Sequence, residues 1–237
     1  MENIEVNIAS QDNAVKERSF IQKLFGVVFS PGDTMMSIVA KPSILFPILI
    51  TAITPLVYIL LRYDLYKEYL EYTMEISMAN ANVPMTPEQM DAAIRVGSVA
   101  GIAGAPIGGL IAWLIGSVAI LILVKVFKGE GSFKQFLSIS GYAYVITLIY
   151  YIISFAVSFA SGNLYLDASL ALLVPAMKGS LFYGVLRGID FFSIWYYVVV
   201  GIGISYASKL SKKKVYLIVG IIYLITILIN VNNAKLM

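Results

Sequence analysis

The sequence predicts an all-α fold of the polytopic integral membrane class, with five transmembrane helices plus interfacial amphipathic helices. Hydrophobic residues make up 59% of the 237 residues, charged residues make up 13%, and mean hydropathy is +0.83. Soluble domains average only about 45–50% apolar residues. A helix needs about 20 mostly apolar residues to cross a bilayer, and five stretches without Lys, Arg, Asp or Glu approach that length. They cover about residues 43–61, 101–124, 141–160, 191–207 and 215–231.

The chain before the first span divides into a tail and a pair of surface helices. Residues 1–15 are polar and aperiodic, which predicts a disordered cytoplasmic tail. Residues 16–42 predict cytoplasmic amphipathic helices lying on the membrane surface. In the first of them Arg18, Gln22 and Lys23 are expected opposite a set of apolar residues at helical spacing. This apolar set is Phe20, Ile21, Leu24, Val27 and Val28.

A second short helix is expected to start at Ser30-Pro31, because serine caps helix starts and proline suits the first helical position.

The outer loop, residues 62–96, follows the first span. Its tyrosines prefer the depth of the membrane interface, which predicts that the first span continues there as a helix. These are Tyr63, Tyr66, Tyr69 and Tyr72. Another helix is expected to begin at Thr86–Gln89, a capping box with proline at its first position.

The second span carries two series of small residues at four-residue steps, offset by seven residues. The first series is Gly97, Gly101, Ala105 and Gly109, and the second is Gly104, Gly108, Ala112 and Gly116. Seven residues are nearly two helical turns, so both series are expected to share one face. Small residues let helix backbones approach closely in lipid. The pattern therefore predicts GxxxG packing by a central helix, and a glycine-lined pore or substrate groove is the alternative. Pro106 predicts a kink in this span.

The third span follows a second capping box, Ser132–Gln135, and it is rich in hydroxyl side chains. We interpret the hydroxyls as hydrogen bonds between helices, which stabilise by about 0.6 kcal/mol each. A translocation path is the alternative interpretation. The residues concerned are Ser138, Ser140, Tyr142, Tyr144, Thr147, Tyr150, Tyr151, Ser154 and Ser158.

Residues 164–189 predict an outer interfacial helix rather than a sixth span. The segment is apolar, but Pro175 and Lys178 interrupt it, and the uninterrupted part is too short to cross a bilayer. A sixth crossing would also separate the lysines near residue 128 from those near residue 212, against the positive-inside rule.

The fourth span begins at Asp190, whose carboxylate is expected to be stabilised by the helix dipole; proton relay is the alternative. Four lysines in the turn before the fifth span are interpreted as topology anchors: Lys209, Lys212, Lys213 and Lys214. With five spans, their side of the membrane holds eleven Lys and Arg and the other side holds six. This imbalance predicts a cytoplasmic amino terminus and an external carboxyl terminus, residues 232–237, most simply in a bacterial plasma membrane.

The composition also excludes several chemistries. The chain has no Cys and no His, which removes disulfides, thiol nucleophiles, imidazole bases and the usual zinc, haem and iron–sulfur ligands. Carboxylates lie in loops or tails, and no phosphate-binding glycine motif appears. We therefore expect no enzyme activity, no catalytic or metal-binding residues and no cofactor. The net charge of +3 is too balanced for a nucleic-acid partner.

Short motifs are spread along residues 20–230. They are FSP from Phe29, KP from Lys41, GEGSFKQF from Gly129, GY from Gly141, IDFFSIW from Ile189, GIGIS from Gly201 and KLSKK from Lys209. Together they resemble the Yip (Ypt/Rab-interacting protein) domain family of five-span membrane proteins, in particular its bacterial members. The pattern positions are Pro31, Pro42, Gly141, Tyr142, Asp190, Phe192, Trp195 and Gly203.

The resemblance implies a cytoplasmic amino terminus and roles that are not enzymatic. Eukaryotic members of the family act in vesicle trafficking and membrane shaping, bind Rab-type GTPases and associate with one another. Their Asp-Leu-Tyr-Gly-Pro signature near the first span is missing here. Asp64-Leu65-Tyr66 lies after that span and lacks Gly-Pro, which argues against a Rab-type GTPase as partner of this chain.

The sequence favours a membrane scaffold or adaptor that works through helix packing in membrane organisation or trafficking-like processes. Its expected partners are the lipid bilayer, further copies of itself and other membrane proteins. The alternative is a passive or partner-dependent transporter, channel or lipid-moving protein, since Pro47, Pro55 and Pro106 could mark broken helices around a cavity. An ion-coupled device would need an intramembrane charge, and the five spans have none.

Overall fold

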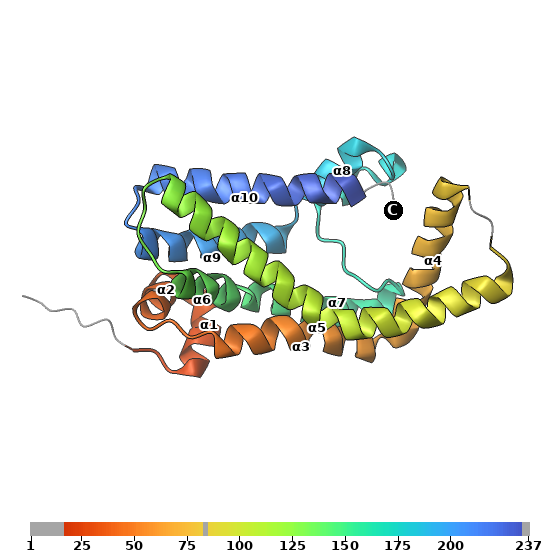
Figure 1. Ribbon diagram of the computed structural model, residues 1–237, viewed down its shortest axis with the longest axis horizontal. Helices are drawn as coiled ribbons and strands as arrows, with labels where there is room; N and C mark the ends of the chain where they lie inside the picture. The colour runs from red at the N-terminus through yellow and green to blue at the C-terminus, as the bar shows by residue number, and fades with distance from the viewer. Residues whose placement is uncertain (1–16, 83–84, 234–237) are drawn as a thin grey trace, which may run out of the picture.

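The computed structural model describes residues 17–82 and 85–233, and in these residues the chain is helical and forms no strand (Figure 1). The predicted all-α class is therefore confirmed. The helices are α1 (Phe20–Phe29), α2 (Pro31–Ala40), α3 (Leu45–Leu61), α4 (Tyr63–Ala81), α5 (Pro87–Val126), α6 (Phe133–Ala143), α7 (Val145–Ser161), α8 (Leu181–Arg187), α9 (Phe191–Ser208) and α10 (Lys212–Asn233). Two short 3-10 turns, η1 (Leu170–Leu173) and η2 (Pro175–Met177), precede α8. The expected tail and the last residues of the chain fall outside the described ranges.

Three helical stretches in the described residues are long and apolar enough to cross a membrane: α5, the continuous α6–α7 stretch Phe133–Ser161, and α9. A fourth is reached if α3 and α4, which are bent by 91° at Arg62, form one broken span. The α3 helix alone has 17 residues, and α10 starts with three lysines. Length and composition thus support three or four spans, which does not confirm the predicted five.

Local capping signals fix several helix starts as predicted. Thr86 and Ser132 each accept a hydrogen bond from the backbone N–H of the glutamine three residues on, and each glutamine side chain bonds back to the cap. Asp190 Oδ1 accepts a 2.9 Å hydrogen bond from Ser193 N at the start of α9. The expectation for Ser30 is wrong, because its hydroxyl makes no capping bond. That hydroxyl instead accepts a hydrogen bond from Arg18.

The outer loop, residues 62–96, is mostly helical as expected, since it contains α4 and the start of the 40-residue α5. The first span does not continue straight into it, because α3 and α4 are bent by 91°. At 1.5 Å per residue α5 is about 60 Å long, about twice the hydrocarbon thickness, so it extends well beyond its predicted span. Residues 164–189 do not form one helix, because Pro175 and Gly179, with φ of +80°, interrupt the helical backbone.

Hydroxyl groups satisfy the irregular backbone of residues 164–189. Tyr58 of α3 donates to Leu164 O, Tyr150 of α7 donates to Leu166 O at 3.0 Å, and Tyr223 of α10 donates to Gly188 O at 3.0 Å. Leu166 N donates to Ser154 Oγ at 3.3 Å. Non-helical backbone at membrane depth is tolerated only where such groups are satisfied within the protein. Part of the hydroxyl content of the third span is explained in this way.

The core centres on α6 rather than on α5, where the sequence placed the central packing helix. Every residue of α6 from Phe136 to Ala143 is buried. Around it pack fully buried side chains of α2, α9 and α10, namely Met35, Ile38, Val199, Val200, Ile204 and Ile218. The α5 helix lies along one side of this core, against α3 and α4, so most of its apolar surface faces outward (Figure 1).

Candidate functional site

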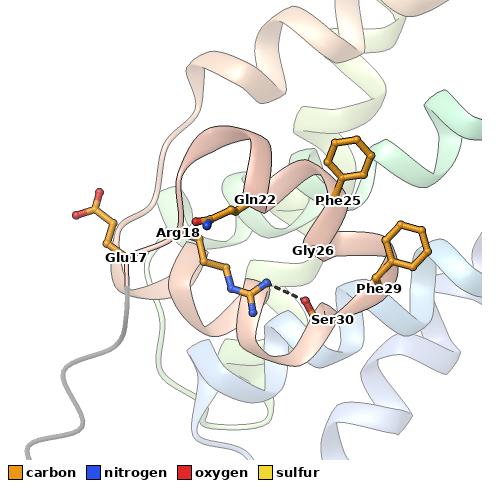
Figure 2. A pocket seen from close by; sticks show the side chains of 7 residues that line it. All are labelled: Glu17, Arg18, Gln22, Phe25, Gly26, Phe29 and Ser30. Atoms are coloured by element: carbon orange, nitrogen blue, oxygen red, sulfur yellow. Dashed lines mark hydrogen bonds between the residues drawn. The ribbon is translucent and has the colours of Figure 1, made fainter.

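The amino-terminal helix pair, α1 and α2, is held together by Arg18. The Arg18 guanidinium donates to Ser30 Oγ at 2.8 Å (Figure 2). It also donates to Thr34 Oγ1 at 2.7 Å and forms a 3.1 Å ion pair with Asp33. The Arg18 backbone N–H donates to Ser37 Oγ at 3.2 Å. Arg18 therefore binds both turns at the start of α2 and fixes the angle between the two helices.

Gly26 makes this close approach possible. A Cβ atom at this position would overlap the Thr34 hydroxyl and would lie 2.6 Å from an Arg18 guanidinium nitrogen. At the chain entry, Lys41 donates a 2.8 Å hydrogen bond to Glu17, and the Lys41 ammonium lowers the pKa of the exposed Glu17 carboxyl. The start of the described chain is thus tied to both ends of α2.

The outward face of α1 is apolar. Phe25 is 64% exposed, Phe29 is 80% exposed and Ile21 is 63% exposed. Figure 2 shows Phe25 and Phe29 beside a pocket of about 380 Å³ whose other lining residues are Glu17, Arg18, Gln22, Gly26 and Ser30. Exposed aromatic side chains on a surface helix are suited to the boundary between headgroups and acyl chains.

The predicted orientation of α1 was wrong in one respect. Lys23, expected on the polar face, is only 7% exposed and faces the interior with Val27. The reason is that α1 is apolar on two sides, and spacing alone did not show which side the core would cover. A long lysine stem can pack along apolar surface, so Lys23 tolerates this place.

The two small-residue series of α5 lie in different surroundings. A Cβ at Gly97 would be 2.8 Å from Met74 Cε of α4, one at Gly101 would overlap the Tyr66 hydroxyl, and one at Gly109 would overlap the Thr51 carbonyl of α3. The second series differs, because a Cβ at Gly104, Gly108 or Gly116 would meet nothing within 4 Å, and Ala112 is exposed.

Helix geometry explains this separation. Each four-residue step advances about 40° around the axis, and α5 contacts α4 near its start and α3 farther along. Successive residues project about 100° apart, so where Gly109 of the first series meets α3, its neighbour Gly108 of the second series points past α3. The result is an open face on α5, defined here as Gly104, Gly108 and Ala112 with the exposed neighbours Ile107, Ile111 and Ile115.

Hydroxyl and indole groups join α5 to α6. Ser117 and Ser140 lie 2.7 Å apart through their Oγ atoms, and Trp113 Nε1 donates to Leu137 O at 3.1 Å. Ser138 donates to Ser43 O at 3.1 Å. Neither Ser117 nor Trp113 was predicted from the sequence to join helices. Trp113 had a usable signal, because a buried indole N–H usually needs an acceptor.

The family-pattern residues do not converge on one site. Pro31 starts α2, Pro42 lies between α2 and α3, and Asp190 caps α9. Gly141 lies against Pro47 and Gly203 lies against Ile139, each with no room for a Cβ. The aromatic members pack on other rings: Tyr142 on Phe46, Phe192 on Tyr150 and Trp195 on Phe191. These positions serve capping and packing.

The four predicted anchor lysines lie beside the loop that follows α5. Lys209 forms a 2.8 Å ion pair with Glu130, and Lys214 Nζ donates to Phe127 O at 3.1 Å. Lys212 and Lys213 are exposed in the first turn of α10. Within the described ranges no three His, Cys, Asp or Glu residues are grouped so that they could hold a metal ion.

Comparison with known proteins gives the following findings. The model of the Yip1 domain matches residues 25–231. The chain is similar to the membrane protein YknW of Bacillus subtilis, with 30% identity over 212 residues, which cover 89% of this chain and 87% of YknW. A shorter match, 38% identical over 53 residues, joins 22% of this chain to 38% of the uncharacterized protein MJ0794 of Methanocaldococcus jannaschii. No solved structure matches the chain.

Proposed function

This chain belongs to the Yip1 domain family of membrane proteins, and from that premise we propose that it is a non-enzymatic membrane scaffold that organises membranes by associating with copies of itself and with other membrane proteins. The observation that carries this proposal is the open face of α5. Its glycines offer bare backbone surface, because a Cβ atom at these positions would meet nothing within 4 Å. Small residues let helix backbones approach closely enough in lipid for van der Waals packing to hold helices together.

The hydroxyl groups of the membrane helices support packing rather than transport. The Ser117 and Ser140 hydroxyls bond to each other across α5 and α6, and the Ser138 hydroxyl donates to Ser43 O. The Ser140 and Ser158 hydroxyls also donate to backbone carbonyls of their own helices. Hydroxyls engaged in this way hold helices together.

The proposal includes five spans, with α3 and α10 as the two remaining crossings, the amino terminus in the cytoplasm and the carboxyl terminus outside. In this arrangement α1 and α2 lie on the cytoplasmic surface, and Phe25 and Phe29 enter the leaflet. The lysines at the start of α10 then lie with the cell interior, in agreement with the positive-inside rule.

Cysteine cross-linking in native membranes tests the scaffold proposal, because the chain has no cysteine of its own. Gly108→Cys should give a disulfide-linked dimer under mild oxidation. Leu224→Cys on α10, which replaces a side chain that is 56% exposed, is the matched control and should stay monomeric. Equal cross-linking at both positions would indicate random collision, and no cross-linking at Gly108 would also refute self-association through this face.

A further inference from the structure

One end of the bundle carries a concentrated positive charge. Residues 125–134 and 208–214, called here the lysine end, contain seven lysines and a single carboxylate, Glu130. The lysines are Lys125, Lys128, Lys134, Lys209, Lys212, Lys213 and Lys214, and all seven are exposed. They lie where α5 and α9 end and where α6 and α10 begin (Figure 1).

The two segments of the lysine end are interlocked, so their charges cannot move apart. Glu130 N donates to Ser208 O at 2.8 Å, and Lys214 Nζ donates to Phe127 O at 3.1 Å. Gly129 packs on Leu210 so closely that a Cβ would lie 2.9 Å from it. Like charges held together in this way repel one another, which costs stability unless anions surround them.

Backbone conformation gives a second, independent observation. In the described residues only three non-glycine residues have positive φ, namely Asn82, Lys128 and Lys209. Lys128 ends α5 in a Schellman arrangement, in which Gly129 N donates to Val124 O at 2.8 Å and Lys128 N donates to Lys125 O at 2.9 Å. Glycine is the usual residue at this position.

The contrast within the chain is informative. The α7 helix ends on Gly162, with φ of +68°, and α4 ends on Asn82, the residue that tolerates this conformation best after glycine. Among the described residues, lysine takes the left-handed position only at the lysine end, where two helices end on it. A side chain kept in an unfavourable backbone conformation points to a role for that side chain.

From these observations we propose that the lysine end is a binding site for the phosphate groups of anionic phospholipids, with Lys128, Lys212 and Lys213 as its main cations. Exposed apolar residues set its depth, because Val126 is 67% exposed and Tyr216 is 70% exposed, each within a few residues of these lysines. Lysines next to such a boundary reach the headgroup layer. Lys209 pairs with Glu130 and contributes less. This inference stands independently of the open face of α5.

Thermal unfolding of the full chain in nanodiscs tests the proposal. The unfolding midpoint of the wild type should be higher in phosphatidylglycerol than in phosphatidylcholine, and salt should reduce the difference. Lys128→Gly should raise the midpoint in phosphatidylcholine, since the strained backbone is relieved, and should reduce the gain from phosphatidylglycerol. If phosphatidylglycerol raised the unfolding midpoint of Lys128→Gly as much as that of the wild type, the proposal would be overturned.

Two controls sharpen the result. Asn82→Gly makes the same kind of change at another left-handed cap, and it should keep the full gain from phosphatidylglycerol. Lys178→Gln removes an exposed lysine elsewhere and should also keep it. Loss of the gain in either control would show a general effect of charge or stability and would contradict a site at the lysine end.

Lipid titration gives the magnitude and identifies the source of the phosphate. Each lysine near anionic headgroups contributes on the order of 1 kcal/mol, so removing one should weaken affinity for phosphatidylglycerol about fivefold. A variant with Lys128→Gly, Lys212→Gln and Lys213→Gln should lose most of the binding. Free glycerol 3-phosphate should compete poorly, and stabilisation by it equal to that by the lipid would refute a lipid site.

Discussion

Two adjacent glycines of α5 give a direct test of which face of this helix is used inside the molecule. Gly108 and Gly109 are neighbours with the same helical backbone, but a Cβ at Gly108 meets nothing within 4 Å. A Cβ at Gly109 would overlap the carbonyl oxygen of Thr51 and would lie 3.2 Å from its carbonyl carbon. Thr51 is fully buried, and its backbone belongs to α3, so it cannot yield as the end of a flexible side chain could.

Gly108→Ala and Gly109→Ala should therefore change the free energy of unfolding in opposite directions. Gly→Ala in a helix gains about 0.5–1 kcal/mol from reduced conformational freedom, and this gain is all that Gly108→Ala should show. At Gly109 the same gain is opposed by overpacking, which costs about 1–3 kcal/mol. In a chain of this size 1 kcal/mol corresponds to about 2–4 °C in the unfolding midpoint. The two variants should therefore separate by several degrees, with Gly109→Ala the less stable.

Thermal unfolding of the monomer in one detergent measures this difference. Gly104→Ala, at a second open position, is the control and should behave like Gly108→Ala. Equal midpoints for the Gly108 and Gly109 variants, or a less stable Gly108 variant, would show that α5 does not pack against α3 through Gly109.

Three further predictions concern the helix caps and the amino-terminal helix pair. Asp190→Ala should lower the free energy of unfolding by about 0.5–2 kcal/mol through loss of the α9 cap, whereas Asp190→Asn, which keeps the acceptor oxygen, should lose little; chemical denaturation measures both. Arg18→Gln should speed amide hydrogen exchange in α1 and α2, because Ser30 and Thr34 lose their partner. Lys41→Gln removes only an exposed ion pair and should change the exchange rates little. Equal changes in exchange rate for the two variants would contradict the role given to Arg18. Lys41 lowers the pKa of Glu17 below its ordinary 4.5, so the stabilising effect of this pair is present above pH 4.5 and is lost as the pH falls through the folded-state pKa. NMR titration should show a higher pKa for Glu17 in the Lys41→Gln variant than in the wild type. An unchanged pKa would exclude the pair.

Features set by a few consecutive residues were predicted well. The capping boxes at Thr86 and Ser132 were visible in the sequence, because each joins a side chain to a backbone N–H three residues on. Asp190 was expected at a helix start for its interaction with the helix dipole, and the hydrogen bond that it accepts from Ser193 N was not predicted. The break at residues 164–189 had a local signal in Pro175, although the two 3-10 turns that it produces were not predicted.

Features that depend on a distant partner were not visible. The sequence put Lys23 on a polar face and both glycine series on one packed face. The structure instead buries Lys23 and leaves Gly104 and Gly108 open. Arg18 had been considered only for its charge, because its partners Ser30 and Thr34 gain importance only when α2 folds back against α1.

The sequence by itself determined that this protein is helical and belongs in a membrane, and where several helices begin. The physical reason is that lipid solvation and capping act on each residue or short segment separately. Only the tertiary structure decided which side of each helix meets a neighbour. That choice depends on the positions and crossing angles of helices that are distant in the sequence. The bend at Arg62 and the central place of α6 were settled at that level. The surfaces left open, the α5 face and the lysine end, follow from the same arrangement.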